Sequence, residues 1–130
     1  MKTLHLIRHA KSSWDHPDLA DVERPLNDRG EQACRLMAPA IYEAGCRFEN
    51  VFCSIATRAQ MTIQGISDAL PNMQIQWEVD PELYTFSSND IIDWLSRLNN
   101  GIRDVVIVGH NPAFTSVINQ LGDQHLDNLP

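Results

Sequence analysis

The stretch Asp104-Val105-Val106-Ile107-Val108-Gly109-His110 decides the fold, because it is almost continuously apolar until it ends at a histidine. Such a run is typical of a parallel strand that helices cover on both faces. A second run, Leu4-His5-Leu6-Ile7-Arg8-His9, also ends at a histidine. Ligands of parallel α/β sheets bind outside the carboxyl ends of the strands. The two histidines and Arg8 therefore predict one pocket, suited to phosphate, that is built from distant parts of the sequence.

Strand-like and helix-like patterns alternate between these two runs. Strands are predicted at about 3–8, 51–54, 75–79 and 104–108, and helices at about 28–45, 56–70, 89–100 and 112–121. Pro39 lies inside the first helix, where an interior proline costs about 3 kcal/mol, so we expect a kink or break there. The polar stretch 10–27 is predicted to be a long loop directly after His9. This alternation predicts an α/β fold, a three-layer α/β/α sandwich with a mostly parallel sheet.

Length and charge limit the organisation and the partners of the chain. With 130 residues, the chain fits a single domain. Its last residues, Asp127-Asn128-Leu129-Pro130, are uncapped and partly apolar, and we expect that a C-terminal strand of the domain is missing. The formal net charge of −7 argues against a nucleic-acid partner, because nucleic acids are bound through clustered Lys and Arg. An acidic chain can still hold a small basic pocket.

The cysteines and the amino terminus favour the cytoplasm. Cys34, Cys46 and Cys53 are odd in number and lack C-x-x-C spacing, so we expect neither a disulfide framework nor a zinc site. The apolar run at the amino terminus is broken by His5 and Arg8, and it is too short and too polar for a signal sequence or a membrane span.

Three short motifs carry the chemistry. They are Arg8-His9, Ser54-Ile55-Ala56-Thr57-Arg58 and Gly109-His110-Asn111-Pro112. Each alone has an ordinary structural explanation: a hydrogen-bonded histidine at a strand end, a solvated arginine in the first turn of a helix, or a helix-capping turn. All three nevertheless follow predicted strands at the same edge of the sheet. Their joint order is therefore far more specific than any one of them.

With these motifs, the sequence resembles the histidine phosphatase (phosphoglycerate mutase-like) superfamily from Met1 to Pro130. The segments Arg8-His9-Ala10-Lys11-Ser12 and Arg24-Pro25-Leu26, together with Gly30, resemble the SixA-type phosphohistidine phosphatases of that superfamily. The resemblance implies a phosphoglycerate mutase-like fold.

The resemblance also implies a mechanism with no metal and no cofactor. His9 matches the nucleophile that attacks phosphorus and forms a phosphohistidine, which water then hydrolyses. Arg8 and Arg58 would bind the phosphoryl oxygens through multidentate hydrogen bonds. His110, the second histidine of the family pattern, would act as a cationic clamp on the same oxygens.

Three further residues are expected to bind substrate from the long loop. Arg24 and Lys11 could contact phosphate, or each could be a solvated charge. Ser12 could lend a hydroxyl group, although a role in a turn is equally compatible with its position. Trp14 is expected at the mouth of the pocket.

The sequence departs from the wider superfamily where the general acid is expected. Ala10 replaces a glycine after the histidine, and Trp14 is followed by Asp15 instead of a phosphate-binding asparagine; an ionised Asp15 should not face phosphate. The Leu-x-Glu pattern of the proton donor is replaced by Leu83-Tyr84-Thr85, and Glu82 stands in the wrong register. Because imidazole leaves with little help, a missing acid favours a phosphoramidate over an alcohol ester.

We therefore expect a cytoplasmic, metal-independent phosphatase of phosphohistidine on a phosphorelay or phosphocarrier protein, with an open pocket suited to a protein-bound phosphate. One alternative is a small-molecule phosphomonoesterase. Another is a phosphate-recognition module without catalysis. We expect no membrane partner, and the sequence leaves the oligomeric state open.

Overall fold

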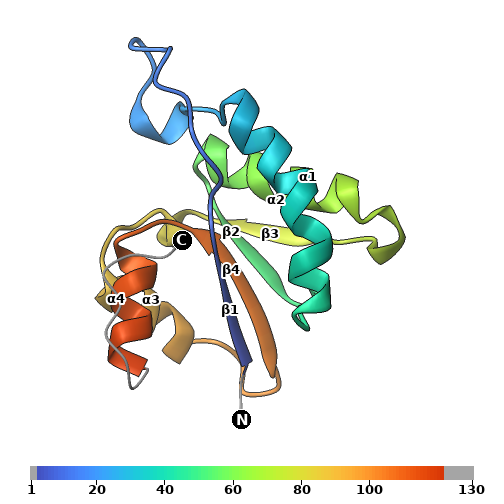
Figure 1. Ribbon diagram of the computed structural model, residues 1–130. Coiled ribbons are helices and arrows are strands. Elements are labelled where there is room, and N and C mark those ends of the chain that lie inside the picture. The colour runs from blue at the N-terminus through green and yellow to red at the C-terminus, as the bar shows by residue number, and fades with distance from the viewer. Residues whose placement is uncertain (1–2, 122–130) are drawn as a thin grey trace.

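A four-stranded parallel sheet forms the centre of the computed structural model, which describes residues 3–121 (Figure 1). Its strands are β1 (Thr3–Arg8), β2 (Val51–Ser54), β3 (Trp77–Asp80) and β4 (Asp104–Gly109). They lie in the order β1-β4-β2-β3, and all three strand pairs are parallel. The apolar strand β4 is thus a central strand, with β1 on one side and β2 on the other.

Helices cover both faces of this sheet (Figure 1). Helices α1 (Asp28–Glu43) and α2 (Thr57–Ala69) pack together on one face, and α3 (Ser88–Ser96) and α4 (Ala113–Leu121) pack together on the other. Alternate residues of β4 feed the two cores: Val106 and Val108 join the core with α1 and α2, while Val105 and Ile107 join the core with α3 and α4. This confirms the predicted three-layer α/β/α sandwich.

Helix α1 corrects the expectation at Pro39. The helix starts as predicted, because the Asn27 side chain accepts a hydrogen bond from the Gly30 backbone N–H, but it then runs through Pro39 without a break. Pro39 lies on the exposed side of the helix, four residues after the exposed Arg35. A carbonyl group that loses its helical partner on this side can be hydrated, which lowers the cost of the proline.

Other boundaries differ from the sequence prediction by a few residues. A 3-10 helix (Pro71–Met73) and Gln74, with φ 51°, precede β3, so this strand begins at Trp77 instead of Ile75. Helix α3 ends at Ser96, before the predicted Asn100. The predicted absence of a C-terminal strand concerns residues outside 3–121. Within the described residues, no helix is long and apolar enough to cross a membrane.

Candidate active site

The carboxyl ends of β1 and β4 bring the two histidines together. Arg8 pairs with Gly109 in the sheet, and the His9 backbone N–H continues this ladder by donating to the Gly109 carbonyl at 3.0 Å. The next residue on each strand is a histidine, and the His9 and His110 ring centroids lie 5.2 Å apart. The structure therefore brings the two strand-end histidines together, but His9 lines the cavity at this edge of the sheet and the buried His110 does not.

The tautomer of His9 is fixed by its surroundings. Its Nδ1 lies 2.7 Å from the Ala10 carbonyl oxygen, and because a carbonyl only accepts, Nδ1 carries the proton. Burial lowers the pKa of His9, and the nearby Arg58, Arg8 and Arg24 lower it further, although the bond to Ala10 opposes them. His9 is thus a neutral imidazole with its lone pair on Nε2.

Helix α2 positions His9 and supplies Arg58. The Ala10 backbone N–H donates to Thr62 Oγ1 at 2.9 Å, and the Thr62 hydroxyl donates to the Arg58 carbonyl at 2.7 Å. Arg58 is 2% exposed, and its Nε–H donates to His9 Nε2 at 3.3 Å. The first turn of α2, where the motif places Arg58, therefore holds a buried guanidinium against the lone pair of His9. Thr62 has no counterpart in the sequence prediction.

His110 lies at the end of β4 beside His9, in surroundings that disfavour its charged form when the site is empty. The side chain is 1% exposed, its Nε2 shares a 2.8 Å hydrogen bond with the Ser54 hydroxyl, and its Nδ1 is buried without a hydrogen-bond partner within residues 3–121. Burial, then the positive charge of Arg58, lower the pKa of His110 to about 3. In the empty site His110 is therefore neutral near pH 7, and a cationic role towards bound substrate stays a prediction.

Arg24 reaches the site from the long loop after β1. It is 9% exposed, and its Nη1 donates to the Ser12 hydroxyl at 3.0 Å and to the Ser13 carbonyl at 3.1 Å. Its guanidinium carbon lies 3.7 Å from the centre of the exposed Trp14 ring. Arg24 is therefore a buried cation whose position is fixed by hydrogen bonds, and one of these bonds is to the Ser12 hydroxyl.

Sequence reasoning missed Asp21, which lies in a 3-10 helix (Asp21–Glu23) of this loop. Its carboxylate accepts from Arg58 Nη2 at 2.9 Å, from Arg24 Nε at 3.2 Å and from the Tyr84 hydroxyl at 2.5 Å. These partners hold the pKa of Asp21 at about 2, although its partial burial acts in the opposite direction. The only signal in the sequence was an acid three residues before Arg24 in a segment without regular periodicity.

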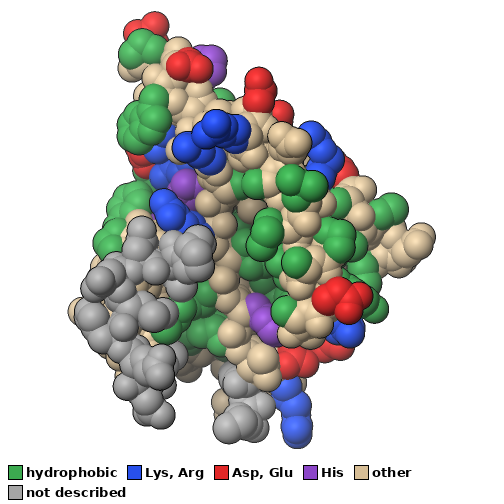
Figure 2. Space-filling view, in the orientation of Figure 1, with side chains coloured by type: hydrophobic (Ala, Val, Ile, Leu, Met, Phe, Trp, Pro, Cys, Tyr) green, Lys and Arg blue, Asp and Glu red, His purple; other side chains and the backbone are tan. Residues whose placement is uncertain are grey.

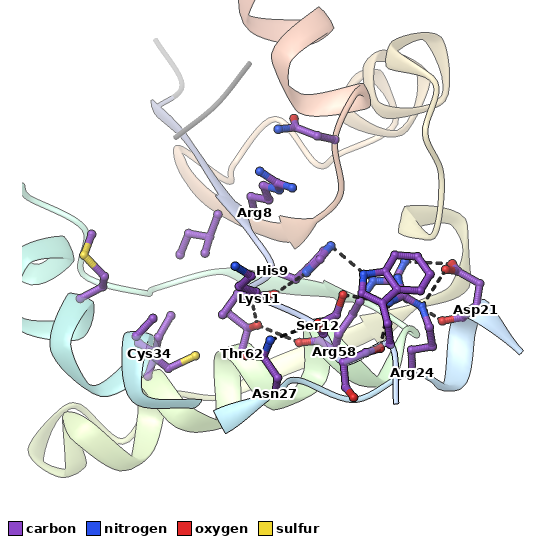
Figure 3. A pocket seen from close by; sticks show the side chains of 18 of the residues that line it. Arg8, His9, Lys11, Ser12, Asp21, Arg24, Asn27, Cys34, Arg58 and Thr62 are labelled. Atoms are coloured by element: carbon purple, nitrogen blue, oxygen red, sulfur yellow. Dashed lines mark hydrogen bonds and ion pairs between the residues drawn. The ribbon is translucent and has the colours of Figure 1, made fainter. Parts of the chain in front are cut away.

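Arg8 and Lys11 are exposed and line the same cavity. Figure 3 shows Arg8 above His9 and apart from Asp21 and Arg24, which lie to the right, and it shows Lys11 beside His9. Within the described part of the chain, the Arg8 and Lys11 side chains make no hydrogen bond or ion pair. Both cations are therefore unengaged at the edge of the site.

The cavity has a volume of about 1010 Å³ and two kinds of wall. Arg8, His9, Arg24 and Arg58 line one part, and Ile7, Met37 and Ile41 are among the residues that line an apolar part. Figure 2 shows Lys and Arg side chains gathered near a histidine on this face of an otherwise acidic chain. Asp15 also lines the cavity, which places a carboxylate closer to the site than its sequence context suggested.

Other acids and possible metal ligands lie outside the centre of the site. Glu82 accepts from Arg97 Nη2 at 2.6 Å and does not line the cavity, in agreement with its unsuitable register. Residues 3–121 contain no group of three or more His, Cys, Asp or Glu side chains that could hold a metal ion.

Comparison with known proteins identifies the family to which this geometry belongs. The model of the histidine phosphatase superfamily (branch 1) matches residues 4–91, more than half of the chain. The chain belongs to the histidine phosphatase superfamily. Phosphoglycerate mutase from Bacillus anthracis, only 15% identical, superimposes with a TM-score of 0.72 over 92% of this chain and 79% of its own. The predicted phosphoglycerate mutase-like fold is therefore confirmed.

Within the superfamily, the chain is similar to SixA proteins. Phosphohistidine phosphatase SixA of Escherichia coli is 29% identical over 118 residues, which are 89% of this chain and 71% of SixA. A structure of the protein histidine phosphatase SixA complexed with tungstate is 26% identical and has a TM-score of 0.80 over 97% of this chain and 80% of that one. The chain spans 66% of the length of an uncharacterised Mycobacterium tuberculosis relative.

Proposed function

We propose that this chain is a phosphatase that removes the phosphoryl group from phosphohistidine on a protein through a covalent intermediate at His9. The observation that carries the proposal is the state of the His9 ring. Nδ1–H is held by the Ala10 carbonyl and the pKa of the ring is lowered, so Nε2 keeps its lone pair near neutral pH. A neutral imidazole beside arginines is the nucleophile that phosphoryl transfer requires.

The proposed reaction has two steps. His9 Nε2 attacks phosphorus, a P–N bond to His9 forms, and the P–N bond to the substrate imidazole breaks; the leaving nitrogen takes a proton from solvent. Water then attacks phospho-His9, an O–P bond forms, and the P–N bond to His9 breaks with release of inorganic phosphate. Both steps move a phosphoryl group whose charge is spread over its equatorial oxygens.

The cations around His9 are proposed to stabilise those oxygens. Arg58 and Arg24 are buried, where charge-assisted hydrogen bonds are strong, and Arg8 and Lys11 lie at the edge of the cavity. The Nδ1 of His110 is buried without a hydrogen-bond partner within residues 3–121, and it is proposed to bond a phosphoryl oxygen once substrate displaces the side chains that separate this ring from the cavity. A bound phosphoryl dianion would oppose the effect of Arg58 on His110 and raise its pKa, so the cationic clamp would arise only with substrate present.

The state of the neighbouring carboxyl groups supports phosphohistidine over an alcohol ester. An alkoxide leaving group needs a proton from a positioned acid. Glu82 is held by Arg97 and does not line the cavity, and Asp21 is ionised with a pKa of about 2, so neither is placed to give a proton to a leaving group in the site. A substrate imidazole leaves without such a donor, and the SixA relatives carry the name of phosphohistidine phosphatases.

One observation favours a small-molecule phosphomonoester as the second candidate. Ile7, Met37 and Ile41 line the same cavity as His9, and they offer apolar contacts to a substituent of a small phosphomonoester.

The test is release of label from phosphohistidine proteins and from small phosphoesters by the intact chain, His9→Ala and His16→Ala. His16 is an exposed histidine that does not line the cavity, so this variant is a matched control. We expect turnover of phosphohistidine by the intact chain and by His16→Ala, with transient acid-labile label on the protein, and none by His9→Ala. Faster turnover of esters would support the small-molecule phosphatase. Phosphate binding without any turnover would support a recognition module.

We also propose a reducing compartment such as the cytoplasm. Cys34, Cys46 and Cys53 are all buried and free, as suits a protein that is not stabilised by disulfides. Thiol labelling of the unfolded protein from cells would test this, because paired cysteines would contradict the proposal.

A further inference from the structure

An anion already occupies the donors that a phosphoryl group would need. The two buried arginines of the site both donate to the carboxylate of Asp21: Arg58 through Nη2 to Oδ2 at 2.9 Å, and Arg24 through Nε to Oδ1 at 3.2 Å. The Asp21 main-chain carbonyl accepts a further bond from Arg58 Nη1 at 2.6 Å. Figure 3 shows Asp21 on the side of Arg24 and Arg58 that faces away from Arg8.

The same arrangement also engages the nucleophilic nitrogen of His9 in a hydrogen bond. While Asp21 holds both terminal nitrogens of Arg58, the remaining Nε–H donates to His9 Nε2. That nitrogen carries the only lone pair of the ring that can attack phosphorus, because Nδ1 is protonated. Attack therefore requires Arg58 to redirect its Nε–H from His9 to another acceptor. A phosphoryl oxygen next to His9 is such an acceptor.

We propose that Asp21 is an internal counter-anion of the phosphate site, whose carboxylate is displaced from Arg58 Nη2 and Arg24 Nε when a phosphoryl group binds. This inference rests on the proposed phosphatase function. It gives the two arginines two alternative partners, the carboxylate in the empty site and the phosphoryl oxygens in the loaded site.

The exposures of the three partners indicate which of them moves. The side chains of Arg58 and Arg24 are 2% and 10% exposed, whereas that of Asp21 is 46% exposed. Asp21 lies on a three-residue 3-10 helix in a long loop, while Arg58 lies in the first turn of α2. A displaced Asp21 can thus be hydrated, whereas the arginines must keep an anionic partner because an unpaired buried charge is costly. A phosphoryl dianion offers more charge and more acceptors than a carboxylate.

The consequence is a site that binds phosphate less tightly than its arginines allow. Binding of phosphate must break the bonds of Asp21, and return of Asp21 helps to expel the product. Removing the charge of Asp21 should therefore strengthen the binding of inorganic phosphate. A purely structural role of Asp21 predicts the opposite, because Arg58 would then lose its support.

The experiment is calorimetric titration of the intact chain, Asp21→Asn and Asp15→Asn with inorganic phosphate. Asp15→Asn is the matched control, because Asp15 lines the same cavity, loses the same charge and makes no ion pair within residues 3–121. We expect the Kd of Asp21→Asn for phosphate to fall by about tenfold, because one competing charged hydrogen bond is lost. The Kd of Asp15→Asn should change by less than about threefold.

A second variant tests the proposal without changing any charge. Tyr84→Phe removes the 2.5 Å hydrogen bond that holds Asp21 in place, so it should also tighten phosphate binding, by about two- to fivefold. Weaker or unchanged binding in both variants, with binding intact in the parent chain, overturns the role of Asp21 alone. Absence of phosphate binding in the parent chain and in both variants overturns the proposed function together with it.

Discussion

Arg58 joins three groups with one guanidinium, and no other side chain could replace it. Its nitrogens reach His9 Nε2, the Asp21 main chain and the Asp21 carboxylate at once. Lysine keeps the charge but presents it from a single nitrogen. We predict that Arg58→Lys lowers kcat/KM for a phosphohistidine substrate by about 10²–10³-fold, since oxyanion donors contribute on that scale.

Steady-state kinetics of Arg58→Lys should be compared with those of Arg47→Lys. Arg47 lies in the loop that joins α1 to β2, at the other end of the sheet. It is exposed and stacks on Tyr42 of α1. A loss of less than about fivefold in Arg58→Lys would show that charge alone suffices there.

The lowered pKa of His9 leads to a second prediction, which concerns the pH dependence of activity. A nucleophile must be neutral, so activity is lost as pH falls through its pKa, and burial and the nearby arginines place that pKa below 6.5. Arg8 contributes to this lowering and its side chain makes no hydrogen bond within residues 3–121. We predict that Arg8→Gln raises the pKa of His9, measured by NMR titration of the ring, and shifts the acidic limb of kcat/KM to higher pH.

Arg47→Gln is the control for that titration, because it removes a distant charge. A pKa of His9 at or above 6.5 in the parent chain would contradict the assignment of a neutral nucleophile.

Among elements, the contact of α1 with the long loop fixes the site. Gly30 in the first turn of α1 faces the Lys11 carbonyl so closely that a Cβ atom would overlap it. Residues 11–12 would have to move, and with them the Ser12 hydroxyl that supports Arg24. We predict that Gly30→Ala destabilises the fold by about 1–3 kcal/mol, as overpacking does, and also lowers kcat/KM.

Urea unfolding and kinetics of Gly30→Ala should be set against Gly101→Ala, in a turn before β4. There a Cβ would only approach the Asn99 side chain, at 3.3 Å, which is far from the site. Equal effects of the two substitutions would show that the packing of Gly30 does not position the loop.

The sequence was informative about elements wherever one local rule decided them. The apolar run of β4 and the Ser54-to-Arg58 motif each predicted an element that the structure contains, a central strand and the start of α2. The expectation at Pro39 was wrong, because a local penalty was applied without knowing that the proline faces solvent. Asp21 was missed for a related reason: its importance comes from Arg58 and Tyr84, which are 37 and 63 residues away in the chain.

For the whole molecule, burial of a neutral histidine couples the site to stability. The folded state holds the pKa of His110 at about 3, whereas an unfolded chain titrates it near 6.5. Below pH 6.5 the unfolded state binds a proton that the folded state does not, so the free energy of unfolding falls as pH drops from about 6.5 towards about 3. We predict that Tm declines over this range and that His110→Gln, which cannot titrate, flattens the decline.

Binding of phosphate should change this pH dependence of Tm. The negative charge of bound phosphate at Arg58 favours protonated His110, which takes its proton from the phosphate monoanion or from solvent, so saturating phosphate should raise Tm more at pH 5.5 than at pH 7.5 in the parent chain. His110→Gln should lose that difference while His16→Ala, the exposed control, retains it. The measurement is a thermal melt of all three proteins at both pH values with and without phosphate. If His110→Gln kept the parent's pH dependence, another group would be the one that titrates, and the proposed substrate-induced clamp would be wrong.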